Sequence, residues 1–180
     1  LGWSALEANT TGQFNTAVGA EAMRSHTTGS NNTALGYAAL DASTTGGDNT
    51  AIGYNALTAA STSGSYNTAV GKDSLEANTT GTFNTGVGQR SGEGCTTGTK
   101  NVFIGNYSGA AITTGNYNIY VGSDATASGS GVADEVVIGY NATGKGSNTA
   151  FLAPQSGSVY NVGNTTTWNQ TSDRRIKKNI

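Results

Sequence analysis

Residues 49–57 read Asn-Thr-Ala-Ile-Gly-Tyr-Asn-Ala-Leu, and close copies of this run begin at Asn15, Asn32, Asn67 and Asn84. The glycine of the run recurs every seventeen residues, with a single interval of eighteen, at positions 2, 19, 36, 53, 71, 88, 105, 122 and 139. Self-similarity at a fixed short period is the signature of a stacked-repeat protein. The sequence therefore predicts a rod of stacked turns.

Short β-prone runs, separated by glycine-rich turn signals, make up each repeat. The turn signal Thr-Thr-Gly occupies residues 27–29, 44–46, 79–81, 96–98 and 113–115. Glycine at this density would cost a helix roughly 1 kcal/mol per residue. In an extended run, alternate residues face opposite sides. We predict an all-β fold, a parallel β-solenoid of about nine 17-residue rungs.

One branched aliphatic residue recurs at a fixed place in every repeat, although charged residues make up only 11% of the chain. A narrow solenoid needs only a thin core. We expect this stripe to form it, through Val18, Leu35, Ile52, Val70, Val87, Ile104, Val121 and Ile138.

An asparagine precedes the aliphatic stripe in most repeats. In-register stacking at about 4.8 Å per turn would place these amides above one another. We expect a hydrogen-bonded ladder of Asn15, Asn32, Asn49, Asn67, Asn84, Asn101 and Asn118. The extra residue of the eighteen-residue interval lies within residues 59–64, and we expect it in a loop.

The later repeats are more apolar. The threonine at the second strand position gives way to Val102, Ile119 and Val136, and the alanine at the third position gives way to aromatic Phe103 and Tyr120. Both faces of these strands are then apolar, which implies burial on both sides. We expect further copies of the chain, as a homotrimer, to cover the outer face and keep Phe103 and Tyr120 from water.

The period breaks after Gly139. Residues 148–152 arrive early and predict a shortened turn, and Ser158 to Val162 form one β-like run before an isolated Trp168. We divide the chain into a solenoid over residues 1–152, a neck over residues 153–171 and the start of another module over residues 172–180.

Several classes of protein are disfavoured by composition. A single cysteine allows no internal disulfide framework, and a single histidine disfavours the usual zinc ligand sets. No stretch reaches the roughly 18 apolar residues of a membrane span. Basic residues cluster only in the last seven positions, too few for nucleic-acid binding. We expect no cofactor, no metal, no nucleic-acid partner and no membrane insertion.

Residues 49–57 resemble the Ser-Val-Ala-Ile-Gly-x-x-Ala repeats of trimeric autotransporter adhesin heads. The resemblance extends over roughly residues 1–152, although the seventeen-residue period is longer than that family's unit. It implies a parallel β-roll packed as a homotrimer.

Residues 171–180, Thr-Ser-Asp-Arg-Arg-Ile-Lys-Lys-Asn-Ile, resemble the opening of the endosialidase-type intramolecular chaperone of phage tail fibres and tailspikes. In that family the domain assembles the trimer and then cuts itself off. The resemblance implies that Ser172 and Lys177 are catalytic in self-cleavage and that Asp173 follows the cut. A lysine can activate a serine hydroxyl only where burial lowers the lysine pKa. The alternative is an ordinary solvated basic segment.

The two resemblances imply the shaft of a trimeric phage tail fibre in the virion, a non-enzymatic structural protein that attaches to a host-cell receptor or glycan. One alternative is a trimeric adhesin head on a bacterial surface, and another is a fragment of a tailspike glycan depolymerase. The acidic residues look scattered among repeat positions, so we expect no paired-carboxylate site. The Thr-Thr pairs sit at expected corners, so we disfavour an ice-binding face. We expect the recurring aromatic residues to pack between turns or subunits.

Overall fold

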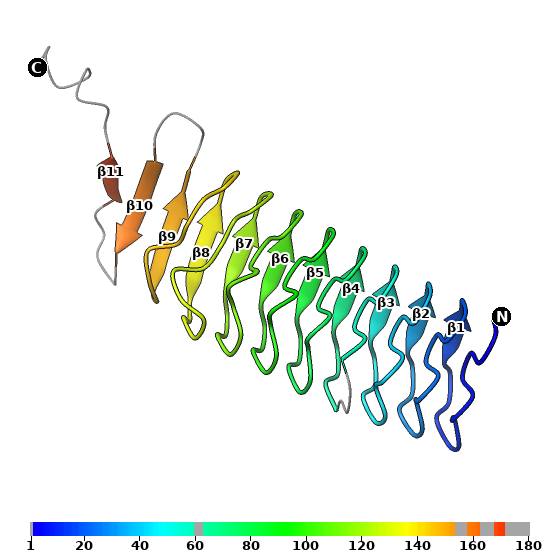
Figure 1. Cartoon of the computed structure of the whole chain (residues 1–180). Coiled ribbons are helices and arrows are strands. Elements are labelled where there is room, and N and C mark those ends of the chain that lie inside the picture. Colours follow the sequence, from blue (N-terminus) through cyan, green and yellow to red (C-terminus); the bar gives the residue numbers. More distant parts are fainter. Residues whose placement is uncertain (1, 60–62, 154–157, 163–167, 172–180) are drawn as a thin grey trace, which may run out of the picture.

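The structure, a computed structural model, describes residues 2–59, 63–153, 158–162 and 168–171, with the backbone alone described in the last two segments. It is all-β over these residues, and every strand lies beside its neighbour in sequence in one sheet of order β1 to β11 (Figure 1). The strands are β1 (Thr16–Val18), β2 (Thr33–Leu35), β3 (Thr50–Ile52), β4 (Thr68–Val70), β5 (Thr85–Val87), β6 (Val102–Ile104), β7 (Ile119–Val121), β8 (Glu135–Ile138), β9 (Thr149–Leu152), β10 (Ser158–Val162) and β11 (Trp168–Thr171).

Strands β1 to β9 are parallel, and the chain makes one turn between each strand and the next. The predicted parallel β-solenoid is thus confirmed, with about eight turns joining the parallel strands β1 to β9. Strand β10 matches the predicted run from Ser158 to Val162, but β11 at Trp168 was not predicted. Both pair antiparallel and extend the same sheet beyond the solenoid (Figure 1).

Register is kept from turn to turn along the parallel part of the sheet. Thr33 pairs with Thr50, and Thr50 pairs with Thr68 across the eighteen-residue interval. The extra residue therefore leaves the strands in phase, as expected of a loop insertion, although residues 60–62 lie outside the described part of the chain. The shortened turn before β9 is confirmed by the pairing of Glu135 with Thr149.

The third strand position faces the interior, and the second and fourth positions face outward. Ala34 and Ala51 are fully buried, whereas Leu35 is 47% exposed and Val18 is 42% exposed. The expectation that the branched aliphatic stripe forms the core was therefore wrong. On β1 to β4 alanine occupies the inward position, and the branched residues of these strands lie outside.

In each turn the interior combines a strand residue with a residue of the facing segment, one small and one large. The strand residue is the small one in the earlier turns and the large one in the later turns. In the earlier turns, Ala51 on the strand packs in one cluster with Leu57 of the facing segment. In the later turns Phe103 fills the interior between Gly92 and Gly109, and a Cβ atom on either glycine would collide with its ring. Phe103 and Tyr120 are fully buried within one chain and need no second copy to cover them, contrary to expectation.

The expected asparagine column is present, and its members from Asn32 onward are buried. Each side-chain oxygen accepts from the backbone N–H of the residue at the same position one turn later, as Asn67 Oδ1 does from Asn84 at 2.9 Å. Each side-chain nitrogen donates to a corner carbonyl, as Asn84 Nδ2 does to Gly98 at 2.8 Å. The column thus links neighbouring turns while it satisfies buried backbone groups.

Residues in the left-handed backbone conformation form the sharp corners. Most turns have three such residues that are not glycine. In one turn these are Asp73 (φ 56°), Leu75 (φ 50°) and Phe83 (φ 59°). The left-handed conformation costs roughly 1 kcal/mol for such residues. Here it directs each N–H along the rod, where Asp73 donates to Tyr54 of the preceding turn and Leu75 to Ser91 of the next. The corner glycine is more constrained, because Gly71 has φ 132° and a Cβ would collide with the Gly88 carbonyl.

Replacement of Asn84 by alanine tests the asparagine column. It would leave the Gly98 carbonyl and the N–H of Asn101, which donates to Asn84 Oδ1 at 3.0 Å, without their partners. We expect a loss of about 3 kcal/mol in unfolding free energy, measured by denaturant titration with circular dichroism. The exposed corner substitution Thr97→Ala should change stability by less than about 0.5 kcal/mol. Equal effects of the two substitutions would contradict the proposed role.

The exchange of small and large interior residues predicts coupling between positions 103 and 109. Phe103→Ala should cost about 3–5 kcal/mol through a cavity. Gly109→Leu should also destabilise, through collision with the Phe103 ring, because leucine already adopts the same backbone conformation at Leu57 and Leu75. The double variant restores the earlier pattern, so it should be more stable than the sum of the single effects by at least about 1 kcal/mol. Strict additivity in thermal unfolding would refute this packing argument.

Candidate functional site

The residues expected to cut the chain, Ser172, Asp173 and Lys177, lie outside the described residues, which end at Thr171 of β11. The candidate site that the structure does describe is the outward surface of the sheet. We call the outward second and fourth positions of strands β1 to β9 the outer face.

The outer face is uncharged along its whole length and is partly apolar. Its fourth-position column, which the sequence analysis assigned to the core, exposes about 40% of several side chains, among them Ile104 (41%) and Ile138 (40%). Its members are Val18, Leu35, Ile52, Val70, Val87, Ile104, Val121, Ile138 and Leu152. An aliphatic stripe that runs the length of a rod is larger than the isolated apolar side chains common on protein surfaces.

The second-position column changes character halfway along the outer face. It is threonine on β1 to β5 and then becomes Val102, Ile119 and Val136. Ile119 is 39% exposed. The outer face is therefore mixed polar and apolar in its first half and almost wholly aliphatic in its second half.

Aromatic side chains stand beside the outer face at one end of several strands, either just before the asparagine or just after the corner glycine. Tyr37 and Tyr54 stack with ring centroids 5.3 Å apart, and Tyr66 stacks on Phe83 at 4.8 Å. The expectation that aromatic residues pack between turns is confirmed for these pairs. Neighbouring rings cover part of the faces that a sugar would need for stacking.

Cations cover further rings at these corners. Lys100 Nζ lies 5.0 Å from the ring centroid of Tyr117, and the Arg90 guanidinium lies 5.3 Å from that of Tyr107. Arg90 also donates a hydrogen bond of 2.9 Å to the Tyr107 hydroxyl. These contacts hold side chains of successive turns together on the surface.

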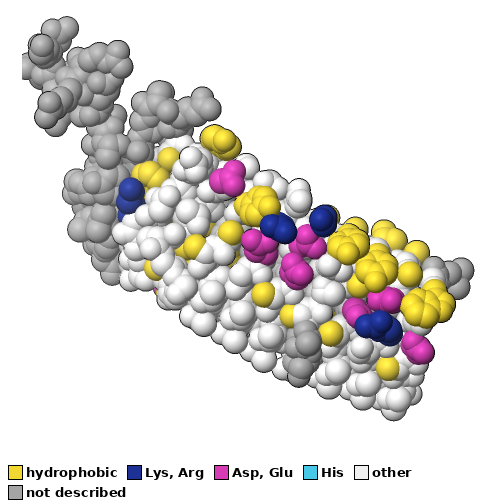
Figure 2. Space-filling model, in the orientation of Figure 1, with side chains coloured by type: hydrophobic (Ala, Val, Ile, Leu, Met, Phe, Trp, Pro, Cys, Tyr) yellow, Lys and Arg dark blue, Asp and Glu magenta, His cyan; other side chains and the backbone are white. Residues whose placement is uncertain are grey.

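Most acidic side chains occupy two repeat positions three residues apart, on the flank that returns from one strand to the next. The expectation that they are scattered was wrong. One position holds Glu7, Asp41, Glu76 and Glu93 together with Arg24, and the other holds Glu21, Asp73 and Asp124 together with Arg90. Figure 2 shows acidic and basic side chains in mixed groups beside apolar ones.

Arginines pair with several of these acids, both within a turn and between turns. Arg24 lies 3.2 Å from Glu21 of its own turn and 2.9 Å from Asp41 of the next. Arg90 lies 3.4 Å from Glu93 of its own turn and 3.7 Å from Asp73 of the preceding one. Because such pairs are partly exposed, each is worth at most about 1 kcal/mol. The mixed charges make this flank a solvated surface that links turns.

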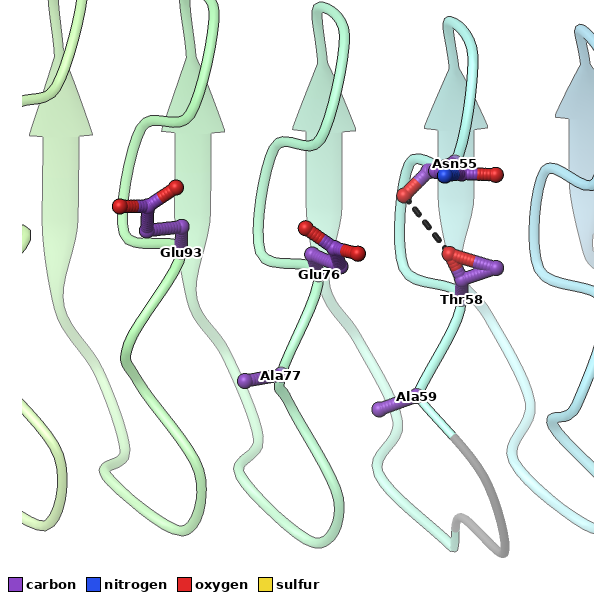
Figure 3. A pocket seen from close by; sticks show the side chains of 6 residues that line it. All are labelled: Asn55, Thr58, Ala59, Glu76, Ala77 and Glu93. Carbon is purple, nitrogen blue, oxygen red and sulfur yellow. Dashed lines mark hydrogen bonds between the residues drawn. The ribbon is translucent and has the colours of Figure 1, made fainter.

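A shallow groove of about 430 Å³ on this flank is lined by Asn55, Thr58, Ala59, Glu76, Ala77 and Glu93. Figure 3 shows Glu76 and Glu93 on the same flank of neighbouring turns. Burial, followed by repulsion from Asp73 and Glu93, raises the pKa of the Glu76 carboxyl. Glycoside hydrolysis uses two carboxyl groups on either side of the scissile bond, whereas Glu76 and Glu93 lie along one open, shallow surface.

Glu135 occupies the asparagine column in β8 and is fully buried, while its neighbour Asp134 is exposed. Its carboxylate accepts hydrogen bonds from the Tyr120 hydroxyl (2.8 Å), the Ser128 hydroxyl (2.8 Å) and the Gly146 N–H (2.7 Å). Burial, and then the bond to Glu135, raises the pKa of Tyr120. Every partner donates, so the cluster is a satisfied structural network at the end of the solenoid.

The buried His26 and Cys95 side chains also contact backbone carbonyl groups. Both ring nitrogens of His26 contact carbonyl oxygens, at Ser43 (2.6 Å) and Gly29 (3.0 Å). Burial raises the pKa of the Cys95 thiol to about 11, which leaves it unreactive at neutral pH.

The threonine pairs form only one exposed column. A flat ice-binding face would need both threonines of each pair to be exposed. Thr96 Oγ1 donates to the Thr113 carbonyl at 3.1 Å and is partly buried, whereas Thr97 is exposed.

Within the part of the chain that the structure describes, no group of three or more His, Cys, Asp or Glu side chains is placed to hold a metal ion. No helix among the same residues is long and apolar enough to cross a bilayer.

Comparison with known proteins gave no match to any family model, curated protein or solved structure.

Proposed function

We propose that the chain is a structural fibre protein, the trimeric shaft segment of a phage tail fibre that takes part in attachment to the host cell. The observation that carries the proposal is the outer face. It is uncharged, partly aliphatic and continuous along a rod whose turns are in register.

Stiffness along the axis supports a mechanical role. Main-chain hydrogen bonds join each turn to the next, and the asparagine column adds buried bonds such as Asn49 Oδ1 to the N–H of Asn67 at 2.9 Å. Bending the rod would strain many such bonds together. A rod of this kind transmits force and holds a receptor-binding region at a distance.

The outer face supports self-association as the partner class. Nine parallel strands about 4.8 Å apart give a face roughly 40 Å long. With the flanking aromatic corners, that length suits an interface of about 800 Å² per partner. Parallel copies would set equal columns at equal heights and would bury aliphatic side chains that a single chain leaves in water.

The receptor or glycan would meet the surfaces that remain outside the trimer. The flank with Asn55, Thr58 and Glu76 offers amide, hydroxyl and carboxylate groups in a shallow groove. These groups can hydrogen-bond a polar ligand.

A bacterial adhesin head remains the second candidate, favoured by the resemblance of residues 49–57 to adhesin-head repeats. A membrane anchor in the full-length protein would decide for it. The depolymerase alternative has less support, because the groove that holds Glu76 and Glu93 is open and shallow.

The trimer is tested by the mass of the protein in solution. We expect light scattering after size exclusion to give three times the chain mass of 18.1 kDa, because burial of the outer face favours association. A species that remains monomeric at all accessible concentrations would rule out this architecture.

Self-cleavage is tested in the full-length protein with its complete chaperone. Ser172 would be the catalytic serine and Lys177 its base, and the cut would precede Asp173. Mass spectrometry should find a new C-terminus at Ser172, and Ser172→Ala should abolish it because no hydroxyl remains to react. Ser158→Ala serves as the control and should be cut normally. Cleavage that persists in the Ser172 variant would refute this assignment.

A further inference from the structure

We infer that the copies of the chain hold one another chiefly through the second half of the outer face, on strands β6 to β9, and that the first half contributes little. This inference rests on the proposed trimer and adds where its binding energy lies. We call this half the aliphatic patch, formed by Val102, Ile104, Ile119, Val121, Val136, Ile138, Ala150 and Leu152.

The chemistry of the second strand position separates the two halves. On β1 to β5 this position is threonine, whose hydroxyl is hydrated, and burial of an unpaired hydroxyl costs roughly 1–3 kcal/mol in proteins. On β6 to β8 it is Val102, Ile119 or Val136, whose burial is favourable. Contact with the same partner surface is therefore far more favourable in the second half.

The interior behind the aliphatic patch also differs. Phe103 and Tyr120 stack there with centroids 5.9 Å apart and planes 5° apart, and both are fully buried. Tyr120 is further held by its bond to Glu135. Large packed rings behind the strands keep the patch rigid, so little conformational entropy is lost on binding.

A second copy of the chain fits this patch better than the chain's own tail. Residues 172–180 follow β11 at this end of the sheet, but they carry Arg174, Arg175, Lys177 and Lys178. Burial of unpaired cations against an uncharged face is strongly unfavourable. A parallel copy presents an uncharged aliphatic column of the same length and spacing. A few central residues usually carry most of the energy of an interface, which agrees with a patch smaller than the whole face.

Two substitutions at one repeat position separate the halves. Ile119 and Thr33 occupy the same outward position, and both are exposed in the single chain. In analytical ultracentrifugation over a dilution series, Ile119→Asp should raise the dissociation concentration by at least about 100-fold, whereas Thr33→Asp should raise it by less than about 5-fold. Ile119→Thr, which copies the first-half residue and stays β-branched, should weaken association by about 10-fold. This milder variant keeps the test valid if Ile119→Asp does not fold, as judged by circular dichroism.

The outcomes distinguish the inference from the proposed function. If wild-type protein associates but Thr33→Asp disrupts it as much as Ile119→Asp does, the assignment to the aliphatic patch is overturned and the trimer stands. If wild-type protein is a monomer at every concentration, the trimer and the patch both fail, and the face belongs to a foreign partner.

Discussion

Hydrogen bonding along the rod axis is the constraint on which the rest of the structure depends. Each turn leaves its backbone N–H and carbonyl groups to the turns on either side, as when Thr68 donates to Asn84 and Gly71 donates to Ile52. A turn alone would leave these groups unpaired, so stability belongs to the stack. Because backbone pairing requires register, each side chain lies above its counterpart in the preceding turn. Columns of asparagine, aromatic or acidic residues follow from that requirement.

Register also explains how the interior tolerates variation. The coil encloses a narrow space whose width is set by the backbone, so a larger side chain in one column requires a smaller side chain in another. Leu75 yields to Gly92 and Gly109 where Phe103 enters. The exchange keeps the coil dimensions nearly constant, and strand pairing continues unbroken from β5 to β6. Interior volume, more than hydrophobicity at one position, decides which residues a turn accepts.

The periodic sequence was sufficient to predict the solenoid, its parallel register and the asparagine column, because these depend only on the spacing of repeated residues. The burial of that column was not predicted. The interior face was predicted wrongly, because hydrophobicity favoured Val18 over Ala17 as core. The alternation of residues along the strand could have identified the interior face correctly, since Asn32 and Ala34 share a face and Asn32 needs buried partners. Left-handed residues such as Phe83 were missed because nothing local distinguishes them from extended residues. The grouping of Asp41 with Glu76 and Glu93 was visible only after the eighteen-residue interval was counted. Ser172 and Lys177 depend on resemblance alone.

The two halves of the outer face also differ in their tendency to associate nonspecifically. An exposed aliphatic sheet face promotes nonspecific association. Threonine keeps β-branched shape at the second strand position while its hydroxyl remains hydrated, so β1 to β5 retain regular strands with a less adhesive surface. Confining aliphatic residues at the second position to β6 to β9 limits the mainly aliphatic part of the face to one end of the rod. In the proposed trimer, parallel copies that meet first at that end would have their remaining columns at equal heights.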